Sequence, residues 1–278
     1  MSDFAKALPT FAELAEGVRR IVAPNPSMMT GPGTNTYLFG VREIAVVDPG
    51  PRLRVHIDDI IDKAGAPVRW VLATHTHPDH SPGVRLLAEK TGAEVLGMPA
   101  PEGEHQDASF RPTRVLADGD RLETAEFVLE AIHTPGHASN HLCFRHPATN
   151  WILTGDHVID GSTVVINPPD GNMSHDLESL RKVKALRPDA LLPGHGDRIV
   201  DPDRLIDWII GHRLEREAKV LAAVKANAGL TTRALVPIVY EDVPPKLYAW
   251  AERSLLAHLE KLAQDRAVVH GDDRWRAA

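Results

Sequence analysis

The segment THTHPDH, residues 74–80, follows directly on the apolar stretch VRWVL and holds three histidines and one aspartate within six positions. Four of its five residues are apolar, and a mostly apolar stretch of this length predicts a strand buried on both faces, so the polar segment must lie at the end of that strand. His75 and His77 are two positions apart, and alternate side chains of an extended chain point to the same side. Asp79 and His80 follow around a proline bend. Imidazole and carboxylate groups are the usual nitrogen and oxygen ligands of zinc, so this turn predicts a metal site.

Three later segments repeat this arrangement. HTPGH, LTGDH and LPGHGD each follow an apolar stretch, and each carries a glycine that lets the backbone approach a crowded centre. We therefore predict that four strand ends converge on two metal ions ~3.5–4 Å apart, the spacing of two-metal hydrolases. The predicted ligand sets are His75, His77 and His137 for one ion and Asp79, His80 and His195 for the other, with Asp156 bridging the two.

Strand-like and helix-like patterns alternate along residues 34–197, and each strand ends in a polar loop. This order predicts an α/β fold in which the sheet is the scaffold and the loops hold the chemistry. Within it, SHDLESLRKVKAL predicts a helix with Ser174 as its N-cap. The later part of the chain is mostly helical and ends in a short strand pair. We predict a metal-binding domain over residues 1–214 and a small winged-helix-like module over residues 215–278.

Charge and composition narrow the classes of function. The chain of 278 residues has a formal net charge of −7, and residues 201–278 hold twelve acidic and twelve basic side chains, so the excess acid lies in residues 1–200. This distribution argues against strong DNA binding, which needs a basic face. The sequence has no apolar run long enough to predict a membrane span, and the N-terminus has no secretory pattern, so a cytoplasmic location is expected. The single cysteine, Cys143, allows no internal disulfide.

The motifs as a group resemble a known family. THTHPDH followed by TPGH, TGD and PGHG is similar to the metallo-β-lactamase superfamily, whose signature is H-x-H-x-D-H with later His, Asp and His ligands. GPGTNTYLFG, VVDPG and the helical tail resemble one branch, the β-lactamase-like proteins related to a mitochondrial endoribonuclease. The resemblance implies an αββα sandwich with the metals at one edge and a winged-helix-like module near the site.

The ligand chemistry and the resemblance imply the same reaction. Two zinc ions would lower the pKa of a bridging water to about 7 and so provide a metal-bridging hydroxide, which would attack an ester or phosphodiester-type bond. Asp79 is the catalytic candidate, because a carboxylate ligand can also orient the hydroxide or pass a proton to the leaving group. The same ligands accept iron or manganese, so they do not decide the metal.

Five further residues are candidates for supporting the metals or contacting substrate. Asp48 ends a strand in VVDPG, where it either holds a ligand histidine in its tautomer or makes a turn. Asn140 and His141 follow a predicted ligand closely, and His141 either reaches substrate or packs at a strand start. Asp170 lies in a loop that can border the cleft. Tyr248 either caps substrate or packs in the helical tail.

The substrate stays open between several classes. The branch resemblance favours single-stranded RNA, although single-strand binders usually supply a basic track. Lactonases and thioester hydrolases of the glyoxalase II kind share all seven ligands, but glyoxalase II also needs basic glutathione-binding residues that the neutral tail does not offer. True β-lactamases of this superfamily normally lack the bridging aspartate, so Asp156 argues against lactam hydrolysis as the main activity, and a promiscuous β-lactamase remains an alternative.

Two alternatives of another class also remain. A winged-helix module can bind nucleic acid or a protein partner with the metal in a structural role, although the balanced charge of residues 201–278 counts against DNA reading. A flavin-linked oxidoreductase with two irons in the same ligand frame would need a flavodoxin-like domain, for which the sequence has no segment.

Overall fold

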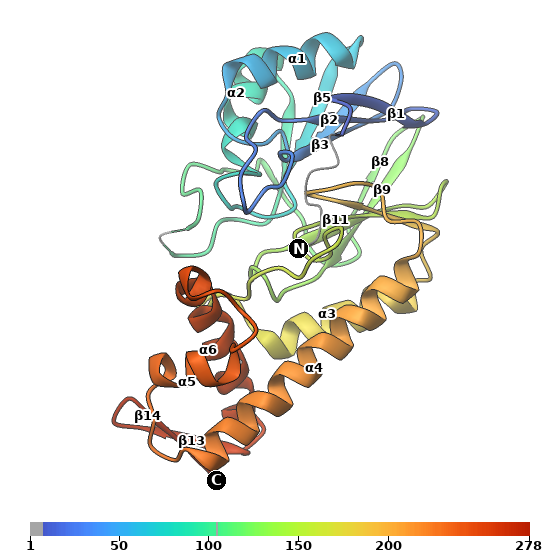
Figure 1. Cartoon of the computed structure of the whole chain (residues 1–278). Helices are drawn as coiled ribbons and strands as arrows, with labels where there is room; N and C mark the ends of the chain where they lie inside the picture. Colours follow the sequence, from blue (N-terminus) through green and yellow to red (C-terminus); the bar gives the residue numbers. More distant parts are fainter. Residues whose placement is uncertain (1–7, 104) are drawn as a thin grey trace.

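The computed structural model describes residues 8–103 and 105–278, and its first layer is a mixed sheet (Figure 1). Within these residues the sheet has seven strands, antiparallel from β1 to β4 and parallel from β4 to β7. The strands lie in chain order: β1 (Phe11–Ala15), β2 (Val18–Val22), β3 (Asn35–Phe39), β4 (Ile44–Val47), β5 (Val68–Leu72), β6 (Glu94–Gly97) and β7 (Arg114–Val115).

The second sheet packs against the first. It has five strands in the described part of the chain, in the order β12-β11-β10-β9-β8, and only the β11–β12 pair is parallel. Its strands are β8 (Arg121–Glu123), β9 (Val128–His133), β10 (Leu142–His146), β11 (Trp151–Gly155) and β12 (Ala190–Pro193). Phe39 and Leu72 of the first sheet share one buried cluster with Leu129 and Phe144 of the second, so the main core lies between the sheets.

Helices cover the outer face of each sheet, as Figure 1 shows. Alternation along β3 and β4 turns Leu38 and Val46 outward, where they pack with Ile57 of α1 (Arg54–Ala64) and Leu87 of α2 (Pro82–Thr91). Helices α3 (Met173–Ala185) and α4 (Pro202–Ala226) pack in the same way on the second sheet. The predicted αββα sandwich is therefore confirmed.

The C-terminal part has its own apolar cluster. Val220 near the end of α4 packs with Leu235, Leu255 and Trp275. The elements are α5 (Thr232–Val239), a short 3-10 helix (Pro245–Leu247), α6 (Tyr248–Gln264), and the hairpin of β13 (Val268–Gly271) and β14 (Arg274–Ala277). This helical, hairpin-ended unit agrees with the predicted module. The predicted boundary between residues 214 and 215 lies inside α4, and the division into two domains stays a prediction.

Two local features differ from the sequence-based expectations. The predicted N-cap Ser174 is wrong: α3 begins at Met173, and the side chain of Asn172 accepts a hydrogen bond from the backbone N–H of His175 at 3.0 Å. Ser174 already lies inside the first turn, where its hydroxyl bonds Gln264 instead. The sequence pattern does not predict strands β1 and β2, because each has only five residues and neither alternates strictly between apolar and polar residues. No helix in the described ranges is long and apolar enough to cross a membrane.

Candidate metal centre

The seven predicted ligands come from strand ends of both sheets and converge at one edge of the sandwich. The loop after β5 carries His75, His77, Asp79 and His80, while the ends of β9, β11 and β12 lead into the segments with the other three. Their ligand atoms form two clusters, and within each cluster all ligand atoms lie within 4.8 Å of one another. The clusters are the histidine group, made of His75, His77 and His137, and the mixed group, made of Asp79, His80, Asp156 and His195.

In the histidine group, hydrogen bonds determine which ring nitrogens face inward. Thr74 donates its hydroxyl proton to Asp48 at 2.8 Å, so this hydroxyl can only accept from His75 Nδ1 at 3.0 Å. His137 Nδ1 faces the carbonyl of Val165 at 2.8 Å and must donate to it. Both rings therefore present the lone pair of Nε2 inward.

These two lone pairs meet a third ring nitrogen. His77 Nδ1 lies 3.0 Å from His75 Nε2 and 2.9 Å from His137 Nε2. A single proton on His77 Nδ1 can satisfy only one of the two, so a cation at the centre satisfies the arrangement better than hydrogen bonding does. Burial, together with neighbouring histidines, lowers the pKa of His77 to about 3 and that of His75 well below its usual value, so both rings are neutral at pH 7. Neutral imidazole is the form that binds metal.

The mixed group holds buried ligand atoms without hydrogen-bond partners. His80 donates from Nδ1 to Asp48 at 2.9 Å, and His195 Nδ1 faces the carbonyl of Gly33 at 3.3 Å, so both again turn Nε2 inward. Among the described residues, these two Nε2 atoms and Oδ1 of Asp156 are buried and have no hydrogen-bond partner. Such orphaned atoms are rare in folded proteins and are expected where an ion belongs.

Distances inside the mixed group fit a shared cation. Oδ1 of Asp156 lies 3.4 Å from Nε2 of His80 and 3.3 Å from Nε2 of His195, and Oδ2 of Asp79 lies 3.2 Å from the latter. Oδ2 of Asp156 instead faces the histidine group, 3.7 Å from His137 Nε2. The two oxygens of one carboxylate therefore point at different clusters, as a bridging ligand requires.

Charges in the mixed group are arranged in opposed pairs. Burial alone would lower the pKa of His195, but Asp156 and Asp79 outweigh it and raise that pKa to about 9. Burial raises the pKa of Asp156, yet His195 and His80 hold it well below its usual value. A cation bound here would replace protons on imidazoles and would face two ionised carboxylates.

Close approach of the strand ends depends on a glycine. A Cβ placed on Gly194 would lie 2.7 Å from Cε1 of His80 and 2.8 Å from Oδ1 of Asp156. Distances below 3.0 Å are not compatible with a real side chain, so only glycine lets the β12 loop pass this close to the ligands. This agrees with the role predicted for the glycines beside the ligands.

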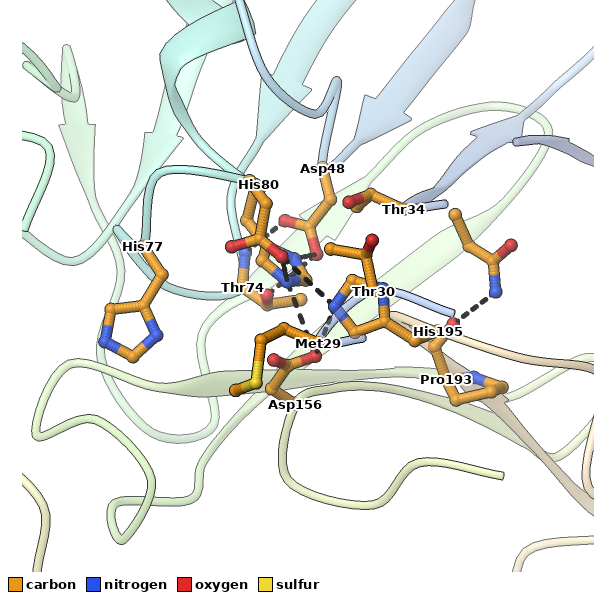
Figure 2. A network of polar contacts seen from close by, with 12 residues as sticks. Met29, Thr30, Thr34, Asp48, Thr74, His77, His80, Asp156, Pro193 and His195 are labelled. Carbon is orange, nitrogen blue, oxygen red and sulfur yellow. Dashed lines mark hydrogen bonds and ion pairs between the residues drawn. The ribbon is translucent and has the colours of Figure 1, made fainter. Parts of the chain in front are cut away.

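Asp48 lies behind both groups at the end of β4. Its carboxylate accepts from His80 Nδ1, and it also accepts from Thr74 through the backbone N–H at 2.7 Å and the hydroxyl at 2.8 Å (Figure 2). Through Thr74 it also determines the tautomer of His75. The sequence pattern points to Asp48 but not to Thr74, for which the one signal is a polar residue between an apolar strand and the first histidine.

We expect Asp48→Asn to weaken metal binding by about 10- to 100-fold, the range found for groups that hold metal ligands. In either orientation, the amide NH₂ of asparagine would face a donor, either the Thr74 N–H or the His80 ring N–H. Asparagine tolerates the left-handed backbone of this position, φ 52°, so the fold should be retained. Zinc titration by calorimetry measures the effect, with the exposed Asp62→Asn on α1 as control. Unchanged affinity would contradict the role of Asp48.

The other four candidates are placed as follows. His141 is fully buried and accepts at Nε2 from the backbone N–H of Asp156 at 3.2 Å, so it supports a ligand segment from inside. Asn140 is buried and donates to Thr76 and to the carbonyl of Pro99. Two loops near the site meet at Asp170, which accepts from Gln106 at 3.0 Å and from the backbone of Ser139 at 3.3 Å.

Tyr248 begins α6 and packs at the edge of the C-terminal apolar cluster. It lines a different pocket from the one beside the metal ligands. The ring of Tyr248 therefore contributes to the packing of the C-terminal helices.

A pocket of about 280 Å³ opens beside the two ligand groups. His137, Asp156 and His195 form part of its wall, and Figure 2 shows Met29 next to Asp156 and His195. Most of the remaining wall is apolar and comes from the loop before β3 and the loop after β11: Met28, Met29, Pro32, Ile159, Val164 and Val165. The described lining residues include Asp160 and Asp197 but no lysine or arginine.

Comparisons with protein families agree with this architecture. A model described as the metallo-beta-lactamase superfamily matches residues 29–195, which contain all seven predicted ligands. A second model, described as the beta-lactamase associated winged helix domain, matches residues 231–275.

Individual proteins extend the likeness over nearly the whole chain. A beta-lactamase-like protein 2 homolog of Drosophila melanogaster is 29% identical over 93% of this chain and 91% of its own length. The thioesterase pkgB of Emericella nidulans is 31% identical over 80% of this chain and 64% of its own length. The structure of a beta-lactamase domain protein from Burkholderia ambifaria has a TM-score of 0.84 at 24% identity, covering 99% of this chain and 96% of that chain, which shows a shared fold.

Proposed function

The chain belongs to the metallo-beta-lactamase superfamily, and we propose that it is a dinuclear metal-dependent hydrolase that cleaves carboxylic ester or thioester bonds beside an uncharged, apolar group. The observation that carries the proposal is the convergence of orphaned, buried ligand atoms in the mixed group. His75, His77 and His137 would hold one cation, and Asp79, His80 and His195 would hold the other, with Asp156 between them.

The composition of the ligand set favours zinc. Five of the seven groups are imidazoles and two are carboxylates, the nitrogen-rich set that zinc prefers, although iron and manganese also accept it. Two divalent cations held there would supply a deprotonated water at neutral pH and would polarise the scissile carbonyl.

Asp79 is the proposed proton carrier. Its side chain is 28% exposed, the largest exposure in the mixed group, so its carboxylate is accessible from solvent, although it does not line the pocket itself. Burial raises the pKa of Asp79, but His80 and His195 outweigh this and hold it below its usual value, so the carboxylate is ionised at neutral pH. An ionised Oδ can take a proton from the attacking water and deliver it to the leaving group.

The pocket beside the ligands favours one of the open substrate classes. A phosphodiester backbone is bound mainly through lysine and arginine, and the described lining has neither. The apolar side chains of the lining fit an uncharged acyl or alcohol group, whose burial is favourable by about 25 cal/mol per Å². Its volume of about 280 Å³ lies near the lower end of the ~300–1,000 Å³ found for small-molecule pockets, so it fits a short chain.

The name of one relative supports the same choice. A protein named as a thioesterase is among the relatives that exceed 30% identity over most of this chain.

Single-stranded RNA is the second candidate substrate, and it rests only on the resemblance of this chain to the endoribonuclease branch. A cytoplasmic location remains a prediction.

The first test is metal content by elemental mass spectrometry, with a substrate panel on the same preparation. We expect about two zinc ions per chain, and faster hydrolysis of butyryl thioesters and esters than of a phosphodiester, an RNA oligonucleotide or a lactam. Fewer than one ion per chain after metal loading would refute the metal centre. Two ions with RNA as the fastest substrate would refute the substrate class alone.

A matched pair of substrates tests the pocket itself. Butyryl and succinyl thioesters of one thiol have the same carbon chain and differ by one terminal carboxylate, so we expect at least a ~10-fold higher kcat/KM for butyryl, about 1.4 kcal/mol. Met29→Lys places an ammonium group in the pocket wall. It should lower the ratio of kcat/KM for butyryl to kcat/KM for succinyl by about 10-fold. Val41→Lys, at another exposed apolar position, should leave it unchanged. An unaltered preference in Met29→Lys would contradict the assigned pocket.

A further inference from the structure

A buried arginine connects the long helix α4 to the loop behind the histidine group. Arg213 is 4% exposed, and its Nη2 donates to the carbonyl of Val164 at 3.0 Å. Its Nε lies 3.1 Å from the carboxylate of Asp176 on α3, a side chain with no exposed surface. One guanidinium thus joins α4, α3 and the loop that follows β11.

The loop that Arg213 contacts also orients a proposed ligand. The carbonyl of Val165, adjacent to Val164, accepts from His137 Nδ1 at 2.8 Å. This hydrogen bond is the reason that His137 presents its Nε2 lone pair toward His77, 2.9 Å away. Val164 and Val165 are consecutive, so Arg213 holds the chain one residue away from the carbonyl that orients His137.

Helix α3 supports the same imidazole from a second direction. A Cβ on Gly136, the residue before His137, would lie 2.5 Å from Cα of Asp176, so the helix and the ligand turn are in close contact. The carbonyl of Gly136 also accepts from the backbone N–H of Asn172 at 2.8 Å. Arg213 therefore contacts both segments that support His137: Asp176, which lies against Gly136, and the loop that contains Val164 and Val165.

We propose that Arg213 is a positioning residue for the His137 imidazole and thereby sets the affinity of the histidine group for its cation. The part that concerns affinity rests on the proposed function, whereas the positioning of the ring does not. The rigid plane of the guanidinium lets Nη2 donate to the Val164 carbonyl while Nε forms an ion pair with the Asp176 carboxylate. A lysine ammonium carries the same charge on a flexible stem and cannot hold both contacts in a fixed geometry.

Arg213→Lys tests the inference in the full chain. It keeps a positive charge beside Asp176 and removes the planar guanidinium group with its several N–H donors. Cobalt(II) titration of the metal-free protein, followed by visible absorption, should show one binding step weakened by about 10- to 100-fold. The other step should change by less than about twofold. Equal affinities in wild type and variant would overturn the effect on the cation.

Arg216 on the same helix offers a matched control. It is also buried, and its guanidinium also joins a carbonyl and a carboxylate, those of Val239 and Asp242 in the C-terminal part. Arg216→Lys should leave both cobalt steps unchanged. If it weakens the same step to the same extent, the effect comes from general loosening of α4, and the inference is overturned.

A metal-free measurement separates this inference from the proposed function. In ¹⁵N spectra the His137 Nδ1–H, bonded to Val165, should give a slowly exchanging imidazole signal in the wild type and in Arg216→Lys. Arg213→Lys should lose it, and persistence of the signal there would overturn the positioning role. A wild type that binds no cobalt but shows this pattern would refute the metal centre while supporting the positioning of His137.

A second variant covers the case in which Arg213→Lys does not fold. Asp176→Asn is isosteric and leaves Arg213 in place, but it removes the ion pair that anchors the guanidinium. It should speed exchange of the His137 imidazole N–H. Unchanged exchange in this variant would count against the inference.

Discussion

Replacement of Asp156 by asparagine is expected to lower kcat/KM by at least ~10³-fold, about 4 kcal/mol of transition-state stabilisation. The reason is the position of this carboxylate, whose Oδ1 faces His80 and His195 and whose Oδ2 faces His137. Asparagine has nearly the same shape but carries no charge, and its NH₂ can donate to a histidine lone pair that a cation would otherwise use. Elemental analysis should find at most one ion per chain.

The same substitution should not harm the metal-free fold. The amide has nearly the same volume as the carboxylate, and its oxygen can still accept from the His195 ring N–H, so the metal-free variant should remain folded. Its melting temperature should not exceed that of the metal-free wild type, because the ion pair between Asp156 and His195 is lost. Asp160→Asn is the control, because Asp160 lines the same pocket but belongs to neither ligand group. It should keep two ions and activity within about threefold. Two bound ions and near-normal activity in Asp156→Asn would refute the bridging role.

Zinc added to the metal-free chain is expected to raise the melting temperature by about 10 °C or more. At a free concentration ~1,000 times its Kd, one ion stabilises the folded state by about 4 kcal/mol, and about 1 kcal/mol shifts the melting temperature of a chain of this size by about 2–4 °C. The structural reason is that zinc would satisfy buried ligand atoms that have no partner among the described residues. Differential scanning calorimetry with and without a chelator measures the shift.

Magnesium provides the contrasting measurement. It prefers six oxygen ligands and retains its waters, whereas five of the seven groups here are imidazoles. Magnesium should therefore leave the melting temperature unchanged at concentrations where zinc stabilises. Equal shifts with both ions would mean that the added charge acts on the acidic surface of the protein and not on the proposed ligands.

The candidate ligands could be predicted from the sequence because their signal is local. His75, His77, Asp79 and His80 follow one apolar strand within six positions, and the later three ligands each follow another. Apolar strands are buried, and polar residues at their ends meet at the edge of a sheet, so the candidate set and the layered fold follow without coordinates.

Local sequence signals left two alternatives open at the start of α3, where two residues can cap the helix, and at Asp48, which can have two roles. Both Asn172 and Ser174 are good N-caps, and only the helix geometry shows that the asparagine oxygen reaches the N–H of His175. Asp48 fits a turn or a supporting role equally well in the sequence. Its hydrogen bonds to Thr74 and His80 decide for the supporting role, and they require strands β4 and β5 to lie side by side.

The sequence by itself thus determined which side chains can bind metal and that strands and helices form a layered α/β fold, because both depend on alternation and spacing along short segments. The αββα arrangement of the layers was implied by the resemblance of the motifs to a known family. The tertiary structure alone decided which atoms of those side chains face one another, that Met29 and Val164 share a pocket wall, and that Arg213 reaches the loop behind His137. These contacts join residues far apart in the chain. They arise because two sheets and their covering helices must pack at near-crystalline density, and no pattern within one segment encodes the outcome.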